Sequence, residues 1–104
     1  MQPVTGGGQG IMPFEAVHNY YERSVFKAVL DATHELSASG TDFDADAIAD
    51  MACVALNRLP ALYIRHDADH AYYLTNAERE TMDRMIEAAV RFAVDFVRQR
   101  PRVG

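Results

Sequence analysis

The chain has 104 residues, 49% of them apolar and 24% charged, so it is expected to form one small folded domain rather than a disordered chain. Its formal net charge of −5 argues against direct binding to duplex nucleic acid, and no apolar run reaches the roughly 18 to 20 residues of a membrane-spanning helix. We therefore expect a cytoplasmic protein that binds neither duplex nucleic acid nor membranes.

Residues 1–12 are rich in glycine and are expected to form a flexible tail, followed by a helical domain over residues 13–99 and a flexible end over residues 100–104. From Phe14 onward, apolar residues recur every three or four positions, which predicts an amphipathic helix. The stripe consists of Phe14, Val17, Tyr21, Val25, Ala28, Ala32 and Leu36. Gly40 is expected to end this helix.

A second helix is expected to begin at Asp42 or Asp44, because aspartate side chains cap free amide groups at helix starts. Its end is placed at residues 57–58, because Pro60 lacks an amide hydrogen and disfavours helical backbone at the preceding residue. The single cysteine, Cys53, has no partner for an internal disulfide. We expect it to pack in the core as a small apolar side chain.

Residues 62–74 have β-favouring side chains on both sides of the polar segment HDADH, which predicts a short hairpin or an extended connection. Thr75 and Glu78 then form the T-x-x-E pattern of a capping box, and the helix that follows is expected to reach about Arg98. Its broad apolar stripe fits either a dimer contact or packing within the domain. The predicted fold is an all-α, compact three-helix domain with this connection between the second and third helices, and a dimer is expected.

Four candidate metal ligands, His66, Asp67, Asp69 and His70, lie within five residues. A turning segment does not hold them on one face, so a solvated polar turn is the favoured interpretation. The alternating aspartates at residues 42–46 lack the glycine and glutamate that a calcium loop requires. The sequence also lacks a nucleophile elbow and a phosphate-binding glycine loop, so we expect no enzymatic activity, no cofactor and no metal.

Arginine and tyrosine residues cluster around the end of the second helix and the connection after it. Arginine binds phosphate or the edge of guanine through two parallel hydrogen bonds, and tyrosine rings stack on bases. The candidate ligand-binding residues are Asn57, Arg58, Tyr63, Arg65, Tyr72 and Tyr73. The structural alternative is that the helix dipole favours Arg58 at the helix end and that Tyr63 belongs to the core.

The segment ALNRLPALY, residues 55–63, matches the pattern A-L-N-x-L-P-x-x-Y, and Asn19, Glu22 and Val25 match N-x-x-E-x-x-V. Through these motifs the chain resembles the ComFB family of late-competence proteins over roughly residues 17–98. One branch of that family carries several cysteines before the nonapeptide, suited to zinc. This chain has Cys53 alone and resembles the branch without them, so no zinc site is implied.

The resemblance implies a non-catalytic, homodimeric receptor for the second messenger cyclic di-GMP. On that basis Arg58 and Arg65 are expected to contact phosphate or guanine edges, Tyr63 to stack on a base, and Asn57 to hold the helix end in shape. The ligand has two phosphates and two guanines, so a two-fold dimer presents the same side chains twice. A downstream regulatory protein is a further expected partner. The alternative is a protein-interaction adaptor with no small-molecule ligand.

Overall fold

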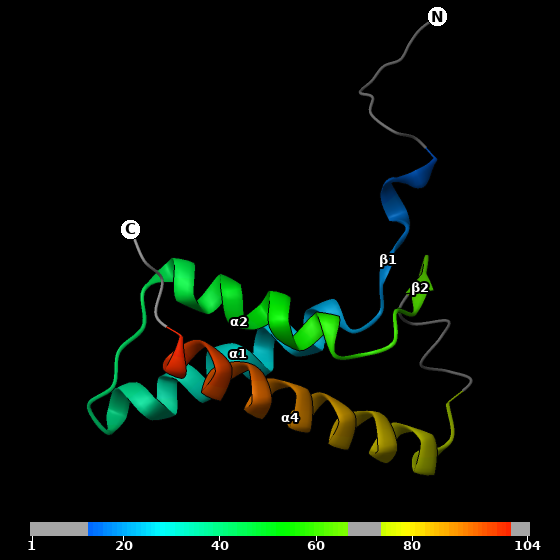
Figure 1. The fold of residues 1–104 in the computed structure, drawn as a ribbon. Coiled ribbons are helices and arrows are strands. Elements are labelled where there is room, and N and C mark those ends of the chain that lie inside the picture. Colours follow the sequence, from blue (N-terminus) through cyan, green and yellow to red (C-terminus); the bar gives the residue numbers. More distant parts are fainter. Residues whose placement is uncertain (1–12, 67–73, 101–104) are drawn as a thin grey trace, which may run out of the picture.

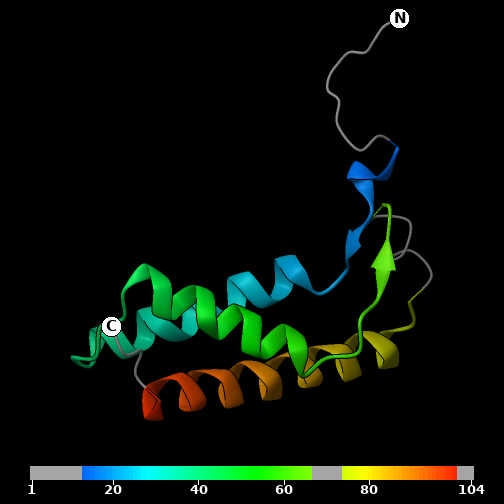
Figure 2. The same ribbon diagram turned by 45° about the horizontal axis from the view of Figure 1, so that its top comes forward.

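Three α-helices make up most of the computed structural model, which describes residues 13–66 and 74–100. Helices α1 (Glu22–Ala38) and α4 (Asn76–Gln99) run in the same direction, and α2 (Ala45–Asn57) runs opposite to both (Figure 1). A two-stranded sheet of β1 (His18–Asn19) and β2 (Tyr63–Ile64) stands at the end of the bundle where α1 begins and α2 ends (Figure 2). The predicted mostly helical fold is confirmed. Within these residues no helix is long and apolar enough to cross a membrane.

The first helix begins later than its apolar stripe predicts. Residues Phe14–Ala16 form a short 3₁₀ turn, η2, and β1 precedes α1. Phe14 and Val17 are 63% and 49% exposed, so the apolar periodicity at this end does not reflect burial. The prediction of a helix from Phe14 is therefore wrong, because the backbone of the next residues bonds across to the segment around Leu62.

Helix α1 ends just before Gly40, as the sequence predicts. Gly40 has a φ of 101°, a left-handed conformation that side chains with a Cβ rarely adopt. The N–H groups of Gly40 and Thr41 donate to the carbonyls of Ser37 and Leu36. These bonds satisfy carbonyl groups that have no partner within the helix, as in other glycine-terminated helices.

Helix α2 has the predicted boundaries. The carboxylate of Asp44 accepts a hydrogen bond from the N–H of Ala47 at 2.8 Å and caps the first turn. Cys53, however, is exposed, so the prediction that it packs in the core is wrong. Met51 and Ala55, one turn apart, are fully buried, and Cys53 between them points to the opposite side of the helix.

The connection after α2 is extended, but its strand pairs with a distant segment. Strand β2 runs antiparallel to β1, with Ile64 opposite His18 and Tyr63 opposite Asn19. The non-helical prediction for residues 62–74 is confirmed at residues 62–66 and 74, and residues 67–73 lie outside the described part. Pairing with β1 places the residues just after β2 beside the first turn of α1.

Helix α4 begins with the predicted capping box: Glu78 N–H donates to Thr75 Oγ1, and Thr75 N–H donates to Glu78 Oε1. We predict that Thr75→Ala lowers the free energy of unfolding by about 1 kcal/mol, because one helix-start amide loses its acceptor. Thr81→Ala is the matched control: Thr81 is exposed within the same helix, and its replacement should change stability by less than about 0.5 kcal/mol. Urea unfolding of both variants tests this, and equal losses would contradict it.

The core lies between the three helices. Helix α4 contributes five side chains to the core, and all five are buried without a second copy of the chain. They are Ile86, Ala89, Val90, Ala93 and Val94. From α1 and α2 it receives Val25, Val29, Met51 and Ala55, and Leu59 follows α2. Packing within the domain therefore accounts for most of the α4 stripe.

Tyr21 is buried at the start of α1, next to Tyr20. Burial, and secondly the neighbouring Tyr20, raise the pKa of Tyr21 above its usual value of 10.0. Above about pH 10 the unfolded chain loses this proton before the folded chain does, so stability present below pH 10 declines as the pH rises. We predict that Tyr21→Phe makes this decline shallower in urea unfolding between pH 8 and about pH 10.5. Parallel curves for the two proteins would contradict the prediction.

Candidate functional site

A pocket of about 530 Å³ lies where the sheet meets the first turn of α1. We call it the basic pocket. It is lined by Glu15, Ala16, His18, Tyr20, Glu22, Arg23, Phe26, Arg65 and His66. These residues come from η2, β1, α1 and the turn after β2, so the antiparallel strand pairing assembles the pocket.

The basic pocket combines two arginines with aromatic rings, and two carboxylates, those of Glu15 and Glu22, also line it. Arg23 and Arg65 form no ion pair with any carboxylate of residues 13–66 and 74–100, and both are exposed. His18 Nδ1 lies 2.8 Å from the carbonyl of Ala16, a contact that orients the ring when Nδ1 carries the proton. The rings of Tyr20 and Phe26 belong to the same lining. Its two guanidinium groups and its rings are the groups that suit an anionic ligand with planar rings.

Asn19 connects the two segments that form the pocket. Its side-chain Oδ1 accepts hydrogen bonds from the N–H of Tyr21 at 3.1 Å and from the N–H of Leu62 at 3.4 Å. The N–H of Tyr20 donates to the Leu62 carbonyl at 2.7 Å. Asn19 thus ties the start of α1 to residue 62, 43 positions further along the chain.

Among the predicted ligand residues that the structure describes, only Arg65 lines the basic pocket, and Tyr63 lies two positions before it. The Tyr63 side chain is 69% exposed, so it is not part of the core. Sequence reasoning missed Arg23 and Phe26, because nothing in their spacing indicates that α1 meets the end of β2. Tyr72 and Tyr73 lie outside the described residues.

Arg58 lies outside the basic pocket, against α4. Its guanidinium carbon is 3.8 Å from the centre of the Phe92 ring on α4, and Arg58 is not among the residues that line the basic pocket. Asn57 is exposed, and its side chain bonds to no residue that the structure describes. The C-terminal end of α2 is capped by backbone rather than by the Asn57 side chain: the N–H of Arg58 donates to backbone carbonyls of the last turn. The structure therefore divides the predicted cluster in two.

The segment with the four candidate metal ligands, for which a solvated polar turn is the favoured interpretation, is only partly described: His66 is placed, whereas Asp67, Asp69 and His70 lie outside the described residues. His66 lines the basic pocket. Across residues 13–66 and 74–100, no group of three or more histidine, cysteine or acidic side chains is arranged to hold a metal ion.

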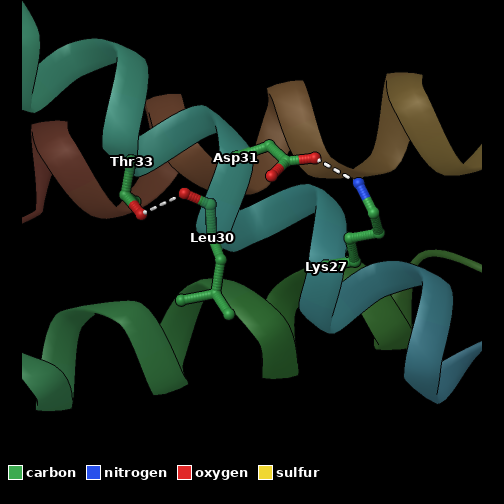
Figure 3. Close-up of polar contacts among 4 residues, drawn as sticks. All are labelled: Lys27, Leu30, Asp31 and Thr33. Carbon is green, nitrogen blue, oxygen red and sulfur yellow. Dashed lines mark hydrogen bonds and ion pairs between the residues drawn. The ribbon is translucent and has the colours of Figure 1, made fainter.

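A second pocket, of about 550 Å³, runs between α1 and α4 and is rich in carboxylates. We call it the acidic groove. Its acidic residues are Asp31, Glu35, Asp83, Glu87 and Asp95. Two of them form ion pairs. Glu87 lies 3.9 Å from Arg91 on α4, and on α1 Asp31 pairs with Lys27 at 2.8 Å, next to the bond from Thr33 Oγ1 to the Leu30 carbonyl (Figure 3). The hydrogen bond to Asp31 raises the pKa of Lys27. The groove does not suit an anionic ligand.

The fold and the basic pocket define a small three-helix domain with a two-stranded sheet at one end and a polar, ring-lined pocket beside that sheet. The family model for the late competence development protein ComFB matches residues 18–101, and the chain belongs to this family. The matched region begins at β1 and includes all three helices. ComFB proteins are competence-related regulatory proteins and not a known enzyme family. No curated protein matches the chain.

Proposed function

We propose that this ComFB domain is a non-catalytic receptor for cyclic di-GMP and that it acts as a homodimer. The observation that carries the proposal is the basic pocket, where Arg23 and Arg65 lie with Tyr20 and Phe26. Its volume of about 530 Å³ is in the usual range for ligand pockets. The ligand is dianionic and has two guanine bases, so it needs both guanidinium groups and flat apolar rings.

The roles in this pocket follow from side-chain chemistry. Arg23 and Arg65 bind phosphate oxygens or the O6 and N7 edge of guanine through charge-assisted hydrogen bonds. Phe26, which is 48% exposed, offers a ring face on which a base stacks. The exposed ring of Tyr63, which lies in β2 two residues before Arg65, is a further stacking surface.

The homodimer is supported by the outer face of α1. Phe26 and Leu30, one turn apart, are 48% and 49% exposed and together form an apolar patch on this face of the helix. Phe26 also lines the basic pocket. A second copy packed on this face would lie beside the pocket, so two pockets could serve one two-fold symmetric ligand.

The dimer surface has its own test. Phe26→Glu combined with Leu30→Glu should convert the dimer into a monomer in sedimentation velocity experiments, because two charges would be buried without partners. Ala49→Glu, which introduces a charge at an exposed position of α2, should leave the dimer unchanged. A wild-type protein that sediments as a monomer at high micromolar concentration would contradict the homodimer.

Isothermal titration calorimetry with cyclic di-GMP tests the ligand. The wild-type chain should bind the dinucleotide and should bind GMP much more weakly, because GMP lacks the second phosphate and base. The absence of heat at millimolar cyclic di-GMP would refute the proposal.

A further inference from the structure

Two arginines and two phenylalanines form a continuous strip on α4 and the end of α2. We call these four residues the aromatic strip. The Arg58 guanidinium lies 3.8 Å from the centre of the Phe92 ring, and the Phe92 and Phe96 rings are stacked with centres 5.8 Å apart. Arg100 closes the strip, with its guanidinium carbon 4.7 Å from the Phe96 ring centre. A cation therefore lies at each end of an aromatic pair.

Charges of both signs on α4 lie along the acidic groove. Asp83, Glu87 and Asp95 line it on the α1 side, as do Arg91 and Arg98, whereas no residue of the aromatic strip lines it. Neither Arg58 nor Arg100 forms an ion pair with a carboxylate anywhere in the described ranges. Although the chain has a formal net charge of −5, these two exposed guanidinium groups have no acidic partner among residues 13–66 and 74–100.

The strip also has the composition of a protein-binding surface. Arginine and aromatic residues are enriched at protein interfaces, and Phe92 is 39% exposed on the outside of the helix. None of the four residues lines the basic pocket or the acidic groove, whereas small-molecule ligands favour concave sites. Stacking on the rings holds each guanidinium in place, so less conformational entropy is lost when its edge binds a carboxylate.

We propose that the aromatic strip binds an acidic segment of a partner protein, in which an apolar side chain lies between two carboxylates. The carboxylates pair with Arg58 and Arg100, and the apolar side chain packs on Phe92 and Phe96. The charge complementarity selects this partner over a basic one. This proposal does not depend on the proposed nucleotide site, which uses Arg23 and Arg65 in the basic pocket.

The test uses a phage library of random 12-residue peptides, panned against the full chain. Enriched peptides should carry at least two acidic residues flanking an apolar one, and fluorescence polarisation should show at least tenfold weaker binding to an R58Q/R100Q variant. The matched control, R23Q/R65Q, removes the same charge from the basic pocket and should bind the peptides as the wild type does. Peptide affinity should also fall as salt is raised.

Several results would overturn the proposal: no enrichment, enrichment of peptides without acidic residues, or equal binding by the wild type and R58Q/R100Q. Loss of cyclic di-GMP binding in a folded R58Q/R100Q variant would also overturn it, because the strip would then belong to the nucleotide site. Circular dichroism establishes that both double variants are folded. If cyclic di-GMP fails to bind the wild type while acidic peptides behave as expected, the nucleotide proposal fails and this one stands.

Discussion

Replacing Met51 by alanine should lower the free energy of unfolding by about 2 to 5 kcal/mol, which is a large part of the stability of a domain this small. Met51 is fully buried and is one of the largest fully buried side chains among the described residues. It belongs to α2, which packs on both α1 and α4. Truncation removes apolar contacts and leaves a cavity between all three helices. Urea unfolding followed by circular dichroism at 222 nm measures the loss.

Cys53→Ala is the matched control for this prediction. Cys53 lies two residues from Met51 on the same helix, but it is exposed, so its replacement should change stability by no more than about 0.5 kcal/mol. Similar values for the two variants would show that α2 does not pack through its Met51 face. The comparison therefore tests which face of α2 is buried. The prediction that Cys53 packs in the core assigned the wrong face.

The second large effect concerns the ligand. Arg23→Gln and Arg65→Gln should each weaken cyclic di-GMP binding by about 1.5 to 3 kcal/mol, the range for hydrogen bonds to charged groups. This corresponds to roughly 10-fold to 150-fold in Kd at 25 °C, and the double variant should show no measurable binding. Arg84→Gln, on the exposed face of α4, provides the control with the same loss of charge. Calorimetry under identical salt conditions measures all four proteins.

Two outcomes would contradict this assignment. If Arg65→Gln binds as well as the wild type, the ligand does not contact the basic pocket through that residue. If Arg84→Gln weakens binding as much as Arg65→Gln does, the effect comes from net charge rather than from contact. Circular dichroism should confirm that every variant is folded.

The helix boundaries that short-range chemistry determines were predictable from the sequence. Asp44 caps α2 through an amide three residues away, and Thr75 and Glu78 bond to each other across one turn. Gly40 and Pro60 end their helices through backbone restrictions that are local to them. In each case the interacting groups lie within a few residues, so the sequence pattern contains the whole interaction.

The candidate site was only partly predictable, because it depends on contacts between distant segments. Strands of two residues have no detectable alternation, and the bond between Asn19 and Leu62 spans 43 positions. That pairing is what places Arg23 beside Arg65, and it also prevents the helix from starting at Phe14. Arg58 and Arg65 are close in the sequence, but the chain direction changes at Pro60. Arg58 contacts Phe92 on α4, whereas Arg65 lines the basic pocket together with residues of α1.

The central claim, that cyclic di-GMP binds at the basic pocket, is tested most directly by NMR of the arginine side chains during titration with the dinucleotide. The Nε–H signals of Arg23 and Arg65 should shift and saturate together, and those of Arg58 and Arg100 should not move. Unchanged spectra at saturating ligand, or shifts confined to Arg58 and Arg100, would contradict the claim.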